Sequence, residues 1–377
     1  MLGLARKTLI HEWRRFLPAI IAVAFAGLLQ LIQAALVLGI FSSASIYING
    51  SHGDLWIGYP GTQSVNLGRS ISAGVESRLL VDPQVTRVEP FLWVDADWRG
   101  SGDTGGISVF VSGIDARAQG MLFSRSLAAG MRARLLEPDT VIVDRADLDS
   151  LGVNVGDSAT INGRSVRVVG VSDGLRALGG VNIVASLETA RHLDPTLASG
   201  DTVTYLVASV RDPRRADEVA ARLRGSRAFG SYDVWTSAEF ARRSQMYWLL
   251  DTGAGAGVLF LTGIVFLAGA VITSQTLMGA VLGSVREYAT LNALGVGVGA
   301  LRHVVMEQAF WVGALGVIGA SVFGALLLTL ARHYSVPVEL DASVTLICLA
   351  LVMGLAVVSG LAAMRAVRRA DPGSLLR

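Results

Sequence analysis

The chain has 377 residues, of which 52% are hydrophobic and only 16% are charged. Soluble globular domains carry roughly 25% charged residues, so this composition excludes an ordinary soluble protein. The net charge of +2 says little by itself, whereas the single cysteine, Cys348, excludes an intramolecular disulfide and a cysteine-based metal site.

Four long apolar runs account for the hydrophobic excess. Each reaches the roughly 20 residues that a helix needs to cross a bilayer core of about 30 Å. We therefore predict four transmembrane helices, over residues 17–41, 247–283, 304–331 and 343–364. A cleaved signal peptide is the alternative for the first run, but its apolar part is longer than the roughly 7–15 residues of a signal sequence. We expect an uncleaved anchor.

The positions of the basic residues predict which segments face the cytoplasm, because Lys and Arg collect in short cytoplasmic loops. Outside the large segment 42–246, they lie mainly in three short segments, residues 1–16, 284–303 and 365–377. The short segment 332–342 instead has one Arg against Glu339 and Asp341. Both termini and segment 284–303 are therefore predicted to be cytoplasmic, and the large segment 42–246 extracytoplasmic.

The pattern of segment 42–246 predicts a mixed α/β domain inserted between the first two helices. Its 21 Arg and 23 Asp plus Glu form a mixed surface, which argues against a nucleic-acid-binding face. Asn162-Gly163 lies between two alternating runs and predicts a hairpin with a type I′ turn, which needs positive φ at both turn residues. Further β-branched runs predict strands over residues 88–94, 107–114, 140–143 and 204–210.

Three helices are predicted within or next to this domain. One covers residues 70–80, and another covers 213–224, with Asp212 as its cap and Gly225 as its stop. The third begins at Ser237 as the N-cap and continues without Gly or Pro into the second transmembrane run. We expect one continuous helix there, which either carries motion or serves only as a linker.

No catalytic apparatus is recognisable in the sequence. There is no Gly-x-Ser-x-Gly elbow and no phosphate-binding loop, and the one lysine, Lys7, excludes a phosphate-loop lysine elsewhere. The histidines are scattered without metal-ligand spacing, at positions 11, 52, 192, 303 and 333. We therefore predict no catalytic residue and no metal site.

Polar and small residues inside the apolar runs are the remaining candidates for special roles. Gln30 and Gln33 lie three residues apart, on one face of the first helix. They form a candidate intramembrane polar face, which either makes interhelical hydrogen bonds or contacts substrate. Four glycines are candidates for close helix packing, within one bundle or across a dimer: Gly279, Gly283, Gly313 and Gly316.

A short amphipathic helix is predicted between the second and third spans, over residues 286–295, with sequence REYATLNALG. Gly295 suits the position after a helix C-terminus. Such a helix is either an inert interfacial turn or a knob that binds the groove of a soluble partner. The physics of the segment alone does not separate these two interpretations.

Segment 286–295 resembles the signature of FtsX-like ABC permeases, the MacB and lipoprotein-release superfamily. In that signature an Arg-Glu pair precedes Leu-x-Ala-Leu-Gly, and Glu-x-Ala follows, as in Glu307-Gln308-Ala309. The tail 365–377, RAVRRADPGSLLR, is similar to the closing motif of the family. The form Glu-Tyr-Ala-Thr-Leu is nearest to the DevC-type branch. The layout of one span, a large outer domain and three further spans matches along the whole chain.

The resemblance implies a permease subunit that is not itself an enzyme and binds no cofactor. A separate ABC ATPase would bind ATP and Mg, and its motion would pass through the cytoplasmic coupling helix to the outer domain. The implied ATPase contacts are Arg286, Glu287, Tyr288, Leu291, Leu294 and Gly295. Glu307 would support the entry to the third span.

The family also implies partners and a location. These are a second permease copy, membrane lipid, and a periplasmic adaptor protein with an outer-membrane channel, all at the bacterial inner membrane. The cargo would be an amphiphile such as a lipid, glycolipid, peptide or drug. An alternative is a signal transducer that regulates an extracytoplasmic cell-wall enzyme, although the large outer domain favours export. A membrane-anchored enzyme is the third possibility, and the sequence offers it no catalytic residues.

Overall fold

The computed structural model describes residues 11–100, 105–224, 231–283, 298–334, 336 and 338–369. The chain divides into two compact units. One consists of Met1–Gly39 with Ala256–Arg377 and is called the helical unit here, and the other is Ile40–Gly255, called the sheet unit. Two chain connections link them, one through the end of the first long helix and one near residue 255.

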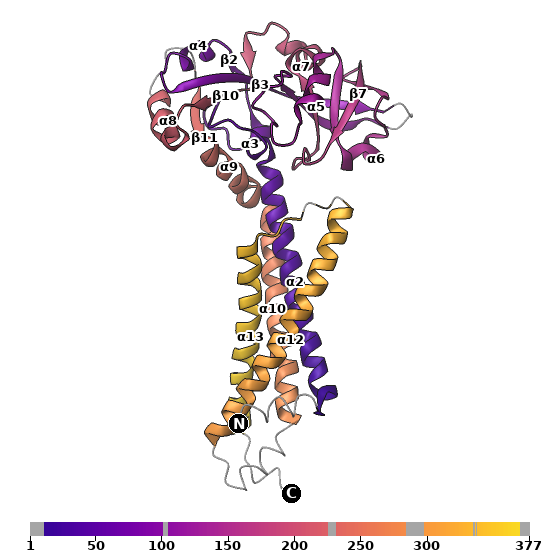
Figure 1. Ribbon diagram of the computed structural model, residues 1–377, viewed down its shortest axis with the longest axis vertical. Helices are drawn as coiled ribbons and strands as arrows, with labels where there is room; N and C mark the ends of the chain where they lie inside the picture. Colours follow the sequence, from indigo (N-terminus) through magenta and orange to yellow (C-terminus); the bar gives the residue numbers. More distant parts are fainter. Residues whose placement is uncertain are drawn as a thin grey trace. The chain divides into compact units, whose positions relative to one another are not determined.

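The described part of the helical unit consists of long helices (Figure 1). Their bounds are α2 (Trp13–Ala44), α10 (Gly253–Gly283), α12 (Val298–His333) and α13 (Ala342–Arg369). Within the described residues, four helices are long and apolar enough to cross a membrane. Large apolar side chains point outwards from them, such as Phe260 at 72% exposure and Leu346 at 68%, as suits a lipid environment. The prediction of four transmembrane helices is confirmed.

Small residues bring these helices close together. A Cβ built at Gly316 of α12 would lie 2.5 Å from Val23 Cγ1 of α2, and one at Gly313 would lie 2.8 Å from Met353 Sδ of α13. Val23 is fully buried in the bundle core. Without a side chain at these glycines, α12 can approach both neighbours, and the gain is van der Waals contact.

The sheet unit contains eleven strands within its described residues. Their bounds are β1 (Leu55–Gly58), β2 (Ile71–Ser72), β3 (Val85–Arg99), β4 (Ile107–Ile114), β5 (Thr140–Asp144), β6 (Ser158–Ile161), β7 (Arg164–Ser172), β8 (Val181–Ser186), β9 (Thr202–Val203), β10 (Tyr205–Val210) and β11 (Asp233–Thr236). Nine form one mixed sheet in the order β11-β1-β10-β3-β4-β8-β5-β7-β6, and β2 pairs with β9. β3 also pairs with β6, so six strands close into a ring.

Short helices and turns cover this sheet (Figure 1). The α-helices are α3 (Ile46–Asn49), α4 (Val75–Leu79), α5 (Ala129–Ala133), α6 (Leu148–Leu151), α7 (Leu187–Leu193), α8 (Ala216–Arg224) and α9 (Ser237–Met246). The 3₁₀ turns are η1 (Val65–Leu67), η2 (Arg134–Leu136), η3 (Arg145–Asp147), η4 (Pro195–Leu197) and η5 (Pro213–Arg215), and η6 (Tyr247–Asp251) is a π-helix. The mixed α/β domain predicted between the first two spans is confirmed.

The hairpin predicted from Asn162-Gly163 joins β6 to β7. Asn162 has φ of 51° and Gly163 has φ of 78°, as a type I′ turn requires. All four runs predicted to be strands are found as parts or the whole of β3, β4, β5 and β10. Asp212 caps the helical segment that follows it by accepting a 3.1 Å hydrogen bond from Arg214 N. Gly225, the predicted stop, lies outside the described residues.

Two helix predictions need correction. Residues 70–80 are helical only over α4, because Ile71 and Ser72 form strand β2 and pair with β9. This pairing with a strand 130 residues later could not be read from the local pattern. The third helix is capped by Thr236, whose Oγ1 accepts a 3.3 Å bond from Glu239 N, and not by Ser237. The hydroxyl of Ser237 donates instead to the carbonyl of Gly53.

The helix predicted to run unbroken from Ser237 into the membrane is interrupted. α9 passes into η6, and Thr252 then takes an extended conformation, with φ of −92° and ψ of 136°, before α10 begins at Gly253. Thr252 is followed by Gly253 and Gly255, which weaken helix formation by roughly 1 kcal/mol each. The prediction of one continuous rod is therefore wrong.

An aromatic cluster forms the core on one side of the sheet. Its large members are Tyr47, Trp56, Phe91, Phe123, Tyr205, Trp235 and Phe240. The rings of Trp235 and Phe240 stack at 4.9 Å, and Tyr47 meets Phe123 edge-on at 5.8 Å. Tyr47 comes from α3, directly after α2, and Phe240 comes from α9. Both chain connections therefore end in the same rigid core.

A buried arginine holds the loop after β4. Arg132 is 1% exposed and donates to the carbonyl oxygens of Asp115, at 2.7 Å, and of Leu122. Burial lowers the pKa of Arg132, and the nearby carboxylates of Glu89 and Asp115 oppose that shift. A Cβ at Gly120 would lie 2.2 Å from Arg132 Nη1. Glycine at 120 is thus a condition for these hydrogen bonds.

Gly316→Ala should destabilise the helical unit by about 1–3 kcal/mol, because its methyl group would overlap Val23 in a packed contact. Gly279→Ala is the matched control, since no atom lies within 4 Å of its Cβ position in the described residues. Thermal unfolding of the detergent-solubilised chain measures the difference. Equal melting temperatures for the two variants would contradict this packing.

Gly120→Ala should destabilise the sheet unit by about 1–3 kcal/mol, because the methyl group would displace the Arg132 guanidinium from its two carbonyl partners. Gly130→Ala lies nearby in α5 with open space around its Cβ position and should be neutral or slightly stabilising. Unfolding followed by tryptophan fluorescence distinguishes them. A Gly120→Ala protein as stable as Gly130→Ala would show that Arg132 can relax without cost.

Candidate functional site

The predicted coupling segment, 286–295, lies outside the described residues. This applies to all six predicted ATPase contacts, Arg286, Glu287, Tyr288, Leu291, Leu294 and Gly295. The helices that flank it are described: α10 ends at Gly283, and α12 begins at Val298. The role of these six residues stays a prediction.

Glu307, predicted to support the entry to the third span, is the tenth residue of α12. Its side chain is half-buried, and its Oε2 atom is enclosed with no hydrogen-bond partner in the described part of the chain. Enclosing a carboxylate oxygen without a partner is costly. Glu307 Oε2 is therefore a free hydrogen-bond acceptor among the described residues, and a donor group from another segment or protein could bind it.

The two glutamines of the predicted polar face are both 9% exposed. Gln33 Nε2 donates a 2.9 Å hydrogen bond to Thr262 Oγ1, which connects α2 to α10. The amide of Gln30 is enclosed, and neither of its polar atoms has a partner among the described residues. Gln33 thus makes an interhelical hydrogen bond, one of the two roles that the sequence left open.

The four glycines proposed for packing have different surroundings. Gly313 and Gly316 lie at the close contacts of α12 described above. A Cβ at Gly283 would meet the guanidinium of Arg15 at 2.5 Å, and Gly279 has open space around it. The structure therefore places Gly313, Gly316 and Gly283 at contacts within this chain and leaves Gly279 on an open face.

Buried hydrogen bonds connect the segment that follows α2 to the segment that precedes α10. Ser244 of α9 donates to the carbonyl of Ala44 at 2.7 Å, and Gln245 Nε2 donates to Ser45 Oγ at 3.0 Å. Ser244 and Ser45 are fully buried. α3 and α9 lie side by side here (Figure 1). We call residues 44–49 with 237–248 the junction.

A chain of hydroxyl groups extends the junction to Ser64, the residue before η1. The hydroxyls of Ser244 and Ser64 are 2.8 Å apart, and Trp248 Nε1 donates to Ser64 Oγ at 3.2 Å. Because Ser244 donates to Ala44, Ser64 must donate to Ser244. We call this series of hydrogen bonds the relay: Trp248 donates to Ser64, Ser64 donates to Ser244, and Ser244 donates to the carbonyl of Ala44. Each hydroxyl or indole hydrogen in the relay therefore has an acceptor.

Sequence reasoning did not find the junction. Ser64 and Ser244 are 180 positions apart, and single serines carry no motif. The only local signal was the aromatic pair Tyr247-Trp248 at the edge of an apolar run. Contacts of this kind depend on the tertiary fold, which a single sequence does not reveal.

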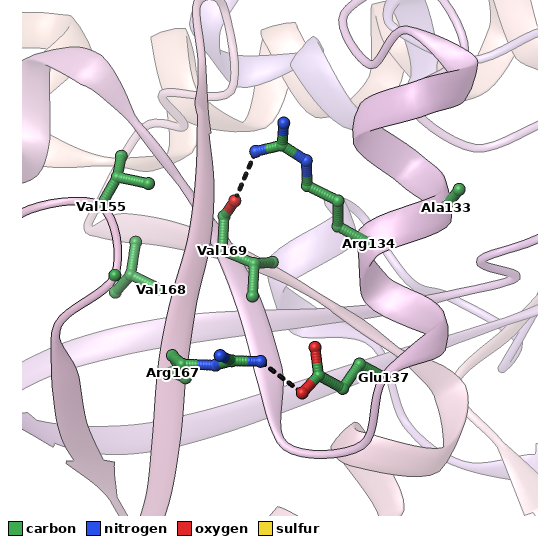
Figure 2. A pocket seen from close by; sticks show the side chains of 8 residues that line it. Ala133, Arg134, Glu137, Val155, Arg167, Val168 and Val169 are labelled. Atoms are coloured by element: carbon green, nitrogen blue, oxygen red, sulfur yellow. Dashed lines mark hydrogen bonds and ion pairs between the residues drawn. The ribbon is translucent and has the colours of Figure 1, made fainter.

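One open pocket of about 380 Å³ lies between β7 and the α5–η2 segment (Figure 2). Figure 2 shows Arg167 directed at Glu137, with which it forms an ion pair, and Arg134 donating to the carbonyl of Val169 at 2.9 Å. Val155 and Val168 form the opposite wall. Because its charged groups already have partners, this pocket has no set of free groups for chemistry.

A second pocket, of about 630 Å³, lies beside α4 and α8. Arg222 forms a two-point ion pair with Asp82, at 2.7 and 3.0 Å. The hydrogen bond from Arg222 lowers the pKa of Asp82, so the carboxylate stays ionised to more acidic pH than usual. Arg222 and Asp82 satisfy each other's charge, so this ion pair is a structural contact.

Titratable groups elsewhere in the described residues do not form a catalytic or metal-binding set. No group of three or more His, Cys, Asp or Glu that could hold a metal was found among them. His192 pairs with Asp139 at 2.6 Å, and burial raises the pKa of Glu89 beside Arg87 and Arg132. These arrangements stabilise loops. The junction is the arrangement that connects the segments next to α2 and α10.

Two family models match the chain and together cover both units. The MacB-like periplasmic core domain matches residues 19–226, which is more than half of the 377 residues. The FtsX-like permease C-terminal domain matches residues 258–372, which include segment 286–295 and Glu307. A search among curated protein sequences found no match.

Three solved structures are similar to about half of this chain. The periplasmic region of MacB from Actinobacillus actinomycetemcomitans is 13% identical, with a TM-score of 0.35, over 52% of this chain and 94% of that one. The extracellular domain of the noncanonic ABC-type transporter YknZ from Gram-positive bacteria is 12% identical, with a TM-score of 0.33, over 49% and 100%. A permease domain from Porphyromonas gingivalis is 11% identical, with a TM-score of 0.31, over 48% and 88%. Similarity at this level carries no functional inference.

The family accounts for the architecture described above. Four apolar helices with a mixed α/β domain between the first and the second fit a bacterial inner-membrane protein. Permeases of this family work with an ABC ATPase and are generally non-catalytic themselves. On the match to more than half of its length, the chain belongs to the MacB/FtsX-type family of ABC transporter permeases.

Proposed function

We propose that this chain is the permease subunit of an exporter and that it works by mechanotransmission. A separate ATPase, which binds ATP and Mg, moves the cytoplasmic segment 286–295, and the movement reaches the extracytoplasmic sheet unit through the membrane helices. The sheet unit then moves an amphiphilic substrate outward. Both termini are cytoplasmic in this proposal.

The junction is the observation that carries the proposal. A domain can follow the movement of its membrane helices only when its attachment is stiff. The buried Ser244 and the half-buried Gln245 bind Ala44 and Ser45, and Tyr47 and Phe240 enter the same aromatic cluster. Both chain connections are thus fixed to one close-packed core, which supports transmission over a loose linkage.

The coupling contacts are proposed from the family motif. Arg286 and Glu287 precede the apolar Leu291 and Leu294 on a short helix, which suits insertion into a groove of the ATPase. Glu307 lies near the start of the next span, and its enclosed oxygen, which has no partner among the described residues, supports a role as an acceptor for a group from this segment or from the ATPase.

The substrate and the remaining partners are proposed at the level of class. Lipids, glycolipids, peptides and drugs are candidate cargoes, and the motif form nearest to the DevC-type branch supports an amphiphile. A second copy of the permease would pair through open small-residue faces such as that of Gly279. An adaptor protein and an outer-membrane channel would complete the path outward.

Glu287→Ala and Leu291→Asp should each uncouple ATP hydrolysis from transport while leaving expression unchanged. The reason is the loss of a charged or an apolar contact at the ATPase groove. Co-purification with the ATPase, ATP hydrolysis and substrate efflux measure the effect. Unchanged efflux together with unchanged ATPase co-purification in both variants would refute the coupling role.

Ser244→Ala should lower transport per ATP hydrolysed, because it removes two buried hydrogen bonds of the relay and leaves Ala44 O and Ser64 without that partner. The expected loss of stability is about 1–3 kcal/mol. Ser165→Ala is the control, since Ser165 is exposed on β7. If Ser244→Ala folds and transports as Ser165→Ala does, the junction has no part in transmission.

A further inference from the structure

Two contacts fix how α2 and α10 lie along each other (Figure 1). Gln33 Nε2 donates to Thr262 Oγ1 at 2.9 Å, and a Cβ at Gly269 would lie 3.2 Å from Ala26 Cβ. From the first contact to the second, the residue numbers fall along α2 and rise by the same amount along α10. The two helices therefore run antiparallel, and both contacts belong to one register.

The same two side-chain types recur one turn earlier on α2. Gln30 precedes Gln33 by one turn, and Ala22 precedes Ala26. Gln30 is 9% exposed, and its enclosed amide has no hydrogen-bond partner among the described residues. An unpaired amide inside an apolar bundle is unfavourable, so Gln30 needs a partner that no described residue supplies in this register. Thr262 would be that partner if α10 lay one turn further along α2.

The end of α10 shows a similar repeat. A Cβ at Gly283 would lie 2.5 Å from the guanidinium of Arg15, so this glycine makes room for the arginine. Gly279 stands one turn before Gly283, and no described atom lies within 4 Å of its Cβ position. The displacement of α10 that brings Thr262 to Gln30 also brings Gly279 level with Arg15, where it offers the same room.

α10 is also less enclosed than α2. Within the most apolar 18 residues of each helix, 11% are buried in α10 and 39% in α2. α2 and α12 interlock, because a Cβ at Gly316 would lie 2.5 Å from Val23 Cγ1, and Gly313 likewise brings α12 close to α13. A one-turn displacement of α10 therefore breaks fewer contacts than the same displacement of α2.

We propose that α2 and α10 form a two-position ratchet. The second position lies one turn, about 5.4 Å, from the described one, with α10 displaced towards the start of α2. Three new pairs then replace the three described ones: Gln30–Thr262, Ala22–Gly269 and Arg15–Gly279. Such one-turn movements are one form of switching between packed helices. The ratchet is a property of the helical unit itself, and its use in transport rests on the proposed function.

The two ends of α10 suit this movement. Segment 286–295 follows α10, so a movement of that segment by the ATPase reaches α10 first. Before α10 the chain is extended at Thr252, whereas α2 runs unbroken to Ala44 at the junction. A residue lengthens the chain by about 1.8 Å when it changes from helical to extended, so about three residues at this break absorb one turn.

Disulfide cross-linking distinguishes the two positions in a chain that also carries Cys348→Ser. The pair Ala26→Cys and Gly269→Cys reports the described register, and the pair Ala22→Cys and Gly269→Cys reports the second. The full chain in lipid nanodiscs is oxidised briefly, and mass spectrometry measures the intramolecular disulfide. The first pair should cross-link readily, because its Cβ positions are 3.2 Å apart, close to the usual disulfide spacing.

The glutamines then test the ratchet through the 22–269 disulfide. Gln33→Met removes the donor of the described register and should raise the yield about threefold, the factor that one interhelical hydrogen bond in a membrane contributes. Gln30→Met removes the donor of the second register and should lower the yield. A yield that Gln33→Met leaves unchanged, or that both substitutions change in the same direction, would overturn the ratchet.

Gly279→Leu gives a test that keeps both glutamines, in case Gln33→Met does not accumulate. Leucine would fill the space that Arg15 enters in the second position, so the 22–269 disulfide should decrease. Gly263→Leu is the matched control on α10, because its Cβ position is also open, and it should leave the yield unchanged. Equal yields in these two variants would overturn the ratchet as well.

Nucleotide dependence keeps this inference distinct from the proposed function. With the ATPase present, ATP and vanadate should raise the 22–269 disulfide several-fold over ADP, and Glu287→Ala in the same chain should abolish that rise. A yield that follows the glutamines but not the nucleotide would leave the ratchet standing and overturn its role in transmission.

Discussion

The hydrogen bond from the Ser244 hydroxyl to the carbonyl of Ala44 joins residues 200 positions apart and is 2.7 Å long. Ala44 is the last residue of α2, so this bond satisfies a carbonyl that the helix itself leaves unpaired. The carbonyl of Ala44 is free to accept because α2 ends there. The hydroxyl of Ser244 reaches it because α9 packs beside α3. The attachment of the sheet unit at both of its chain connections depends on this meeting.

Polar groups are used differently in the two units. In the sheet unit, buried arginine and serine side chains reach backbone carbonyls, as Arg132 and Ser244 do, and so fix loops and helix ends. In the helical unit, contact between helices comes mainly from small residues such as Gly313 and Gly316, with Gln33 adding one interhelical hydrogen bond. The first arrangement fixes loops and helix ends through directional bonds, and the second brings helices together through close packing.

Local signals explain what could be predicted from the sequence. The four spans followed from apolar length, and the β6–β7 hairpin followed from two residues that favour positive φ. Strand β2 was mistaken for helix because its partner β9 is distant in the chain. The break at Thr252 was missed because Gly253 and Gly255, which weaken a helix, are also common where apolar helices pack closely. The junction serines carry no signal that a single sequence could reveal, and the coupling segment, outside the described residues, rests on its motif alone.

The pairing of β3 with β6 reduces the number of strand edges that the sheet exposes. Six strands of the sheet have neighbours on both sides because the ring is closed, and β11, four residues long, is an end strand of the described sheet. Open strand edges invite foreign chains to add on and start aggregates. The closed ring leaves little free edge on the described nine-stranded sheet for such pairing.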